Sequence, residues 1–136
     1  MAKGYTIVAN MKVDKTFDNK YKTSLPKVMK AAAEAAIKSS SNMTTQKPTG
    51  SGFKTYSLDA TVTSLTCTAD VLEAQVSMAV SEDDHMFGML NGKSKLPSKN
   101  PKERDDDVED LVKAVITDLI KKQVDGAIKS KLPKGP

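Results

Sequence analysis

The sequence predicts an α+β domain in which a three- to four-stranded antiparallel or mixed sheet carries two helices packed on one face. Several segments alternate apolar and polar residues, which is the period of a half-buried strand. Two others repeat apolar residues at intervals of three and four, which is the period of an amphipathic helix. The expected order is strand, helix, strand, strand, an optional fourth strand, and helix. Because each strand has one apolar face, both helices are expected to cover the same side.

The first strand is predicted over residues 5–14, and the first helix follows a polar loop at residues 15–23. The apolar face of this strand is expected to consist of Tyr5, Ile7, Ala9, Met11 and Val13. The helix is expected to begin at Ser24, which is a good N-cap, with Pro26 tolerated in the first turn. Its inner stripe would comprise Leu25, Val28, Met29, Ala32, Ala33, Ala36 and Ile37.

A flexible surface loop is predicted at residues 39–52, where Ser, Thr, Pro and Gly predominate. Strands are then predicted over residues 53–65 and 72–80, joined by a turn at 66–70 into an antiparallel hairpin. Their inner faces would consist of Leu58, Ala60 and Val62 on the first strand and Leu72, Ala74, Val76, Met78 and Val80 on the second.

Four large apolar residues follow the hairpin, and their pattern leaves three structures open: Met86, Phe87, Met89 and Leu90. They could form a short edge strand, a bulged continuation of the preceding strand, or an exposed apolar loop. Asn91–Gly92 is a turn-forming pair and is expected to end the segment before a loop at 95–104. If this methionine-rich cluster is exposed, it is suited to adaptable binding of a protein partner. If the segment is an edge strand, it could pair with the edge strand of another subunit.

A long amphipathic helix is predicted over residues 107–129, with Asp107 as its N-cap. Its apolar positions are 108, 111, 112, 115, 116, 119, 120, 124, 127 and 128. The turns after Gly126 are expected to overhang the sheet and leave Ala127, Ile128 and Leu132 available to a partner. Residues 130–136 are expected to form a frayed tail. The predicted interaction residues are therefore Met86, Phe87, Met89, Leu90 and Ile128.

The length and charge of the chain limit the kinds of function that it can have. The 136 residues are expected to form a single domain, 1–136, with a net charge of +4. Residues 1–50 hold nine lysines against three acidic residues, a net charge of +6. A lysine-rich surface for nucleic acid or an anionic surface is therefore an alternative function, with candidate lysines at 12, 15, 20, 22, 27 and 30. The segment has no arginine fork for phosphate, which favours a solvated lysine face.

The sequence contains few residues that could act in catalysis. The chain has one histidine, His85, and one cysteine, Cys67, so an internal disulfide and a paired-histidine metal site are excluded. Cys67 and His85 could approach across the hairpin, but no third residue would orient them. The glycines at 88 and 92 have one residue too few between them for a phosphate-binding loop. We expect no catalytic residue, cofactor or metal, and hence a protein that is not an enzyme.

Nothing in the sequence approaches the roughly 20 apolar residues of a membrane span. The N-terminus, Met1-Ala2-Lys3-Gly4-Tyr5, has no hydrophobic signal core. The chain as written is therefore expected in the cytoplasm, or in the periplasm or outside the cell if a signal peptide has been removed.

The succession of a strand at residue 5, a helix, the 53–80 hairpin and a closing helix resembles the small βαββα domains of bacterial envelope proteins. Examples are the N-terminal domain of TolB, CsgG-like domains and LpoB-type lipoprotein activators. The resemblance covers residues 5–129 as topology; no diagnostic motif matches, so no functional residue is carried over. It implies a non-catalytic structural or interaction module that self-associates as a homo-oligomer or docks on a protein partner in the envelope or in a secreted assembly.

Overall fold

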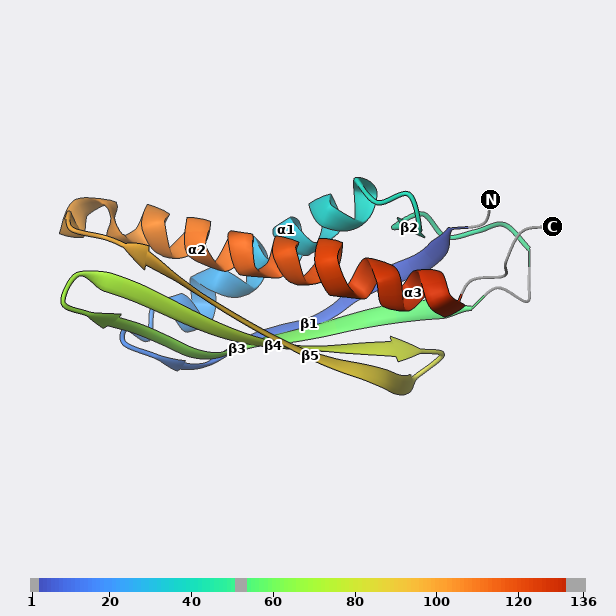
Figure 1. Cartoon of the computed structure of the whole chain (residues 1–136), viewed down its shortest axis with the longest axis horizontal. Coiled ribbons are helices and arrows are strands. Elements are labelled where there is room, and N and C mark those ends of the chain that lie inside the picture. Colours follow the sequence, from blue (N-terminus) through green and yellow to red (C-terminus); the bar gives the residue numbers. More distant parts are fainter. Residues whose placement is uncertain (1–2, 51–53, 132–136) are drawn as a thin grey trace.

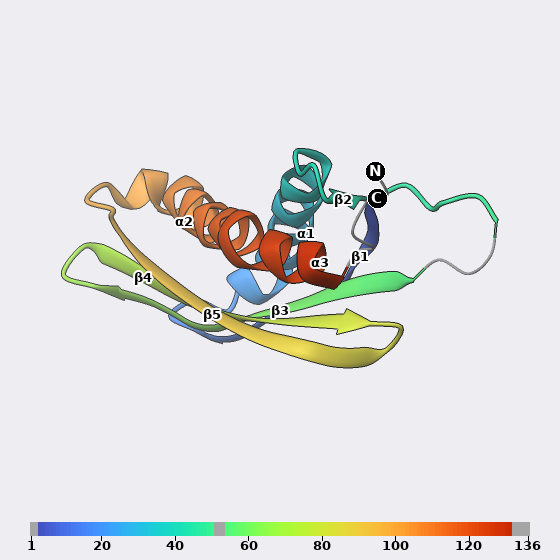
Figure 2. The ribbon, with the colours of Figure 1, turned by 45° about the vertical axis from the view of Figure 1, so that its right-hand side comes forward.

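The computed structural model describes residues 3–50 and 54–131, and it shows a mixed five-stranded sheet covered on one face by helices (Figure 1). The elements are β1 (Gly4–Thr16), α1 (Tyr21–Lys38), β2 (Met43–Thr44), β3 (Thr55–Thr68), β4 (Val71–Glu82), β5 (His85–Pro97), η1 (Pro101–Glu103), α2 (Arg104–Leu119), η2 (Ile120–Val124) and α3 (Asp125–Lys131). The α+β class and the placement of both long helices on one face are confirmed (Figure 2). The sheet has more strands than the three or four that were predicted.

The strand order is β2-β1-β3-β4-β5. β1 runs parallel to β2 and β3, whereas β3–β4 and β4–β5 are antiparallel hairpins. The inner faces predicted for β3 and β4 are confirmed: all eight apolar side chains lie in the core, which also includes two buried tyrosines, Tyr21 and Tyr56. The sheet therefore ends in a very short strand on one side and in the long β5 on the other.

β1 changes its buried face halfway along, and the predicted face is wrong for its first half. The pairing with β3 shifts between Val8 and Met11, which marks a β-bulge. Before the bulge Val8 is 8% exposed and Ile7 is 40% exposed; after it Val13 is buried, as predicted. The extra residue moves the alternation by one position, so a single uninterrupted period does not describe the strand.

α1 begins earlier than predicted, and β2 is a strand that was not predicted. The helix begins at Tyr21 rather than Ser24, and the Tyr21 side chain is buried in the core. Within the predicted loop 39–52, Met43–Thr44 pairs with Gly4–Tyr5 as a parallel edge strand. Met43 is buried, and its contribution to the core explains why part of this loop is ordered. Phe53, the predicted first residue of the next strand, lies outside the described residues.

β5 is a long strand, and the turn predicted at Asn91–Gly92 is wrong. The β4–β5 hairpin turns instead at Asp83 and Asp84, whose φ angles are +47° and +70°. Aspartate tolerates this left-handed region better than most residues, so the earlier pair already reverses the chain. β5 then runs through Asn91 and Gly92 to Pro97, which corrects the predicted loop at 95–104. A Cβ on Gly92 would lie 3.1 Å from Leu119 Cγ, so this glycine permits close approach of α2.

The long C-terminal helix begins before its predicted N-cap. Asp107 lies inside α2, where its carboxylate accepts a hydrogen bond from Ser98 Oγ at 2.7 Å. Asn100 instead caps η1, the short helix that leads into α2; its side chain accepts a hydrogen bond from the Lys102 backbone amide at 3.0 Å. A π-helical segment, η2, separates α2 from α3, and helical structure continues to Lys131, inside the predicted frayed tail.

Ile128 corrects the expected overhang of the last helical turns. Its side chain is 0% exposed, and a Cβ on Gly4 would lie only 2.8 Å from Ile128 Cγ2. The end of α3 therefore packs on the start of β1, and Ile128 belongs to the core rather than to an interaction surface. Leu132, the other residue expected to be available there, lies outside the described residues.

Candidate interaction site

β5 is an edge strand, and its two halves differ in chemistry. One side pairs with β4 along the whole strand, and no strand of the described chain pairs with the other side. Residues 92–97 include Lys93 and Lys95, and such charges protect sheet edges against further pairing. Residues 85–91 contain no lysine, arginine or proline, so only the bulge at Phe87 interrupts their backbone edge.

The structure brings the four predicted residues of β5 together but divides them between two faces. Met86 is 60% exposed and Met89 is 54% exposed; they lie opposite Ser81 and Ala79 on the face away from the helices. Phe87 and Leu90 are partly buried against the core. The division arises because Gly88 pairs with Val80 and Met86 with Ser81, which leaves Phe87 as the extra residue of a bulge.

Phe87 is held on the helix side by aromatic and cationic contacts. Its ring meets Tyr56 edge-on, with centroids 6.2 Å apart, and Lys131 Nζ lies 5.0 Å from the Phe87 centroid. Burial, and then the neighbouring Glu82 carboxylate, raises the pKa of Tyr56 to about 12, so this phenol stays neutral. Phe87 is therefore a packed anchor of the edge rather than a free contact residue.

Charges of opposite sign occupy the two ends of the β5 edge. At the turn, the Asp83 carboxylate accepts a hydrogen bond from the Thr55 amide at 2.9 Å, and Asp84 is exposed. At the other end, Lys95 pairs with Glu73 at 3.5 Å. Lys93 is exposed and makes no ion pair with the described residues. The edge thus runs from an acidic turn through an apolar middle to a basic end.

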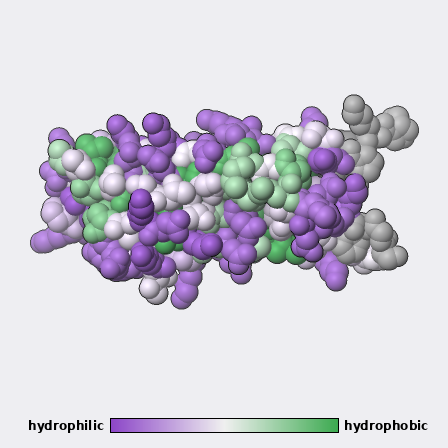
Figure 3. Space-filling view, turned by 90° about the horizontal axis from the view of Figure 1, so that it is seen from below, coloured by the Kyte–Doolittle hydropathy of each residue, from purple (hydrophilic) through white to green (hydrophobic). Residues whose placement is uncertain are grey.

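The outer face of the sheet has no helix over it (Figure 3). Pale and green residues run along its length between purple ones in that view. Two neighbouring shallow hollows of about 540 and 240 Å³ share Asn10 and Asp59. Asp59 accepts hydrogen bonds from the Asn10 amide and from its side chain, so these two residues pair across β1 and β3. Met89 borders the smaller hollow, which therefore adjoins the β5 edge.

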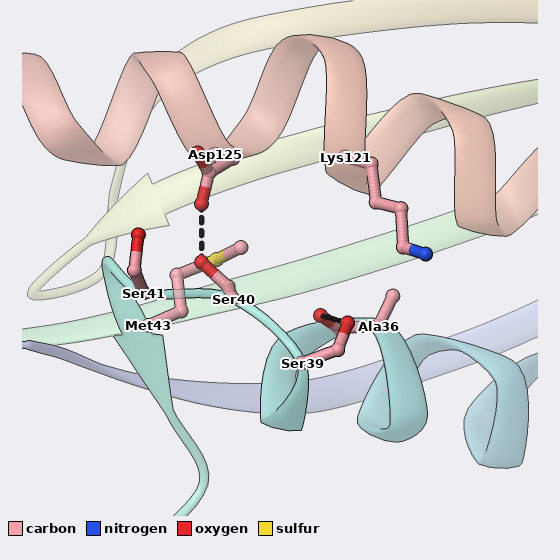
Figure 4. A pocket seen from close by; sticks show the side chains of 7 residues that line it. All are labelled: Ala36, Ser39, Ser40, Ser41, Met43, Lys121 and Asp125. Atoms are coloured by element: carbon pink, nitrogen blue, oxygen red, sulfur yellow. Dashed lines mark hydrogen bonds between the residues drawn. The ribbon is translucent and has the colours of Figure 1, made fainter.

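A hollow of about 320 Å³ on the helix side is a structural junction (Figure 4). Ser40 Oγ donates to the Asp125 carboxylate, and Asn42 Nδ2 donates to its other oxygen at 3.0 Å. These bonds fasten the end of α1 and the approach to β2 onto the first residue of α3. Lys121 projects across the same hollow from η2. The group explains the position of α3 and satisfies Asp125 without a ligand.

The candidate catalytic groups are far apart. Cys67 pairs with Leu72 at one end of the β3–β4 hairpin, whereas His85 pairs with Glu82 at the opposite end. At roughly 3.3 Å per residue these ends lie about 30 Å apart. In the described part of the chain, no group of three or more His, Cys, Asp or Glu side chains could hold a metal ion.

Sequence reasoning missed a polar cluster around Arg104, the chain's single arginine. Its guanidinium donates to Ser98 O at 2.7 Å and contacts Cys67 Sγ at 3.1 Å, and it lies 3.5 Å from Asp70. These contacts join the β3–β4 turn to the start of α2. Only the rarity of arginine in this chain marks the position in the sequence, because the partners lie 6 to 37 residues away.

The lysines of the basic N-terminal third do not gather around one group. Lys20 pairs with Asp105 at 2.9 Å, whereas Lys22, Lys27 and Lys30 are exposed along α1 and Lys12 lies on β1. Binding of nucleic acid or an anionic surface by these lysines stays a prediction. None of the helices described is both long and apolar enough to cross a membrane.

No protein-family model and no curated protein matches the sequence. Among solved structures, the fold is similar to hypothetical protein CT253 from Chlamydia trachomatis, with a TM-score of 0.68, 11% identity, and coverage of 95% of this chain and 99% of that chain. It is also similar to PelC from Paraburkholderia phytofirmans, a dodecamer, with a TM-score of 0.54, 9% identity, and coverage of 88% and 89%. A minor lipoprotein from Acinetobacter baumannii gives a TM-score of 0.53 at 12% identity, with 99% of both chains covered.

The chain therefore shares its fold with bacterial proteins that include a lipoprotein. This agrees with the general resemblance to bacterial envelope proteins. The likeness to the TolB, CsgG and LpoB domains in particular stays a prediction.

Proposed function

We propose that this protein is a non-catalytic assembly module of the bacterial envelope that self-associates through the free edge of β5. The observation that carries the proposal is the edge of residues 85–91, which presents backbone donors and acceptors without a strand partner in the described chain. An edge of this length without lysine, arginine or proline is a template for a further strand. Met86 and Met89 beside it supply adaptable apolar contact area.

Two further observations support the assignment. The fold neighbours include a lipoprotein, and PelC is a dodecamer, so this architecture is compatible with subunit assembly at a bacterial envelope. The separation of Cys67 from His85 across the length of a hairpin supports a role that does not depend on catalysis.

Light scattering coupled to size-exclusion chromatography tests the proposal over a range of protein concentrations. The unmodified chain is expected to exceed its monomer mass of 14.6 kDa, increasingly so at higher concentration. The double variant Met86→Lys, Met89→Lys is expected to return to the monomer mass, because lysines on an edge oppose further pairing. Both positions are exposed, so folding is expected to change by less than about 0.5 kcal/mol per site.

Val71→Lys is the matched control. Val71 is also an exposed apolar residue, but it lies on β4, which is paired on both sides. This variant is expected to self-associate like the unmodified chain. A strict monomer at every concentration, or equal loss of association in the control, would contradict assembly through β5.

A further inference from the structure

We infer that the β5 edge binds β5 of a second copy in antiparallel orientation about a two-fold axis, with Lys93 of each copy beside the Asp83–Asp84 turn of the other. The inference rests on the proposed self-association and specifies its geometry. Two-fold dimers are the commonest closed assemblies, and in them one patch contacts itself. The patch must therefore be complementary to its own reversed copy.

The order of chemistry along β5 meets this requirement. The strand is preceded by acidic Asp83 and Asp84, has apolar residues from Met86 to Leu90, and carries Lys93 near its other end. When a copy is reversed against it, the apolar segments coincide and each basic end meets an acidic turn. Opposite charges placed in this way fix orientation and register more than they add affinity.

The pairing is most regular when it is centred on Met89. Counting Phe87 as the extra residue of its bulge, Asn91 then lies opposite Met86 of the partner subunit, and Lys93 lies opposite Asp84 of the partner subunit. Each pair joins side chains that face the same side of the sheet, as an antiparallel ladder requires. The exposed Met86 and Met89 side chains of both copies then form one apolar patch on the outer face.

A two-fold axis perpendicular to the sheet also preserves the layers of the fold. It joins the two five-stranded sheets edge to edge, and the helices of both copies stay on the same side. The helix-covered face is therefore unobstructed, because the new contact uses only β5 and the Asp83–Asp84 turn that precedes it.

The rival arrangement, β5 against β1 of another copy, is disfavoured by charge and by the strand pairing that β1 already has. β1 and β5 run in the same direction within the sheet. Head-to-tail pairing would therefore be parallel and would place Lys12 and Lys15 near Lys93 and Lys95. Like charges facing each other oppose pairing, and β2 already pairs with the start of the β1 edge at Gly4 and Tyr5.

Charge reversal tests the antiparallel geometry by sedimentation equilibrium. Asp84→Lys and Lys93→Glu, each alone, are expected to raise the dimer dissociation constant about tenfold or more, since two symmetry-related pairs become repulsive. The double variant Asp84→Lys, Lys93→Glu is expected to recover dimerisation. Residues 84 and 93 lie about 30 Å apart within one chain at roughly 3.3 Å per residue, so recovery requires contact between copies.

Two controls make the result specific. Lys27→Glu makes the same charge change as Lys93→Glu, but at an exposed position of α1, and is expected to leave dimerisation unchanged. Lysine at position 84 must adopt a φ of +70°, so thermal unfolding of each variant verifies that the fold persists.

A disulfide test uses the centre of the proposed pairing and needs no charge change. In a Cys67→Ser background, Met89→Cys is expected to form a covalent dimer under mild oxidation, because each Met89 faces its own symmetry mate. Ile7→Cys, on exposed β1, is expected to stay uncrosslinked.

Two results together would overturn the antiparallel geometry while leaving assembly through β5 intact. In that case Met86→Lys, Met89→Lys would abolish self-association, but the double variant Asp84→Lys, Lys93→Glu would not recover it. A strict monomer of the unmodified chain would overturn both.

Discussion

Asp105 is the residue at which the starts of α1 and α2 are joined by a charged side chain. Its carboxylate accepts a hydrogen bond from Tyr21 Oη at 2.7 Å, and Lys20 Nζ lies 2.9 Å away. The hydrogen bond from Lys20, and then that from Tyr21, lowers the pKa of Asp105 below its ordinary value of 3.8. Both charged side chains are more than half exposed, so solvent screens much of this interaction.

We predict that Asp105→Asn lowers the free energy of unfolding at neutral pH by about 0.2–1 kcal/mol. A carboxyl whose pKa is depressed in the folded state stabilises the protein above its unfolded pKa, and this stabilisation is lost as the pH falls through the folded pKa. The difference between the variant and the unmodified chain is therefore expected to shrink as the pH falls below 3.8 and to vanish once the carboxyl is protonated in the folded state. Urea unfolding between pH 2 and 7 measures it.

Asp106→Asn is the matched control, because Asp106 lies in the same first turn of α2 and is exposed. It shares the interaction with the helix dipole but has no ion pair with the described residues. An equal effect of both substitutions would show that Tyr21 and Lys20 contribute nothing measurable.

Burial, and then the hydrogen bond to Asp105, raises the pKa of Tyr21. The stability that the neutral phenol contributes is therefore lost as the pH rises above about 10.

For individual residues, the least predictable features were the contact partners of a side chain and the face of the strand or helix on which it lies. The alternation of β1 predicted Ile7 inside, but the bulge after Val8 reverses that half of the strand. A bulge depends on the register with β3, which lies some 50 residues further along the chain, so a local pattern does not contain it. Ile128 was likewise assigned to the surface because Gly4, on which it packs, is distant in sequence.

The long C-terminal helix supplies the largest continuous apolar stripe. Val108, Leu111, Val112, Val115, Ile116 and Leu119 of α2 are all buried, and the stripe continues through η2 to Ile128. Leu119 also packs against Gly92 of β5, so the helix touches the edge strand directly. Substitutions on this stripe therefore affect both the core and the support of the edge.

We predict that Leu119→Asp, and likewise Val115→Asp, abolishes cooperative folding. Each change places an unpaired charge among buried apolar side chains, at a cost of roughly 4 kcal/mol or more, against a total stability of about 5–15 kcal/mol. Near-ultraviolet circular dichroism and thermal unfolding report the loss. Lys113→Asp, on the exposed side of the same helix, is expected to unfold cooperatively. If Leu119→Asp also folded cooperatively, the stripe would face a partner rather than the sheet.

Element type was more predictable than element boundaries. The periods of β3, β4, α1 and α2 were strong enough to assign each correctly. β5 was ambiguous because two candidate turns lie within ten residues of each other, Asp83–Asp84 and Asn91–Gly92. The structure uses the first, and α2 packs over the second. This choice depends on tertiary packing, which overrides the local turn preference.

At the scale of the whole molecule, the fold persists at very low sequence identity. CT253 shares 11% of its residues with this chain over almost the full length of both. Layers of this kind require a pattern of buried positions rather than particular residues, which is why the class was predictable. The free edge of β5 was not predictable in the same way. It exists only because the chain places β5 last in the sheet, a property of strand order.

That strand order leads to a prediction about hydrogen exchange. β3 and β4 are paired on both sides, so their amides are expected to exchange slowest, at a rate set by global unfolding. In β5, alternate N–H groups point away from β4 and are expected to exchange fast at low protein concentration. At high concentration those of residues 85–93 are expected to slow, because a second copy would accept their hydrogen bonds, while amides of Thr6–Thr16 in β1 stay unchanged.

Exchange measured by mass spectrometry at two protein concentrations distinguishes the possible edges within one sample. Slowing confined to β1 would move the contact to the opposite side of the sheet. Uniform slowing would indicate a change in global stability instead. In the Met86→Lys, Met89→Lys variant the concentration dependence of β5 is expected to disappear while β3 and β4 stay protected. The same peptides therefore report edge pairing and folding separately, and only pairing along β5 protects its outward amides without altering the centre of the sheet.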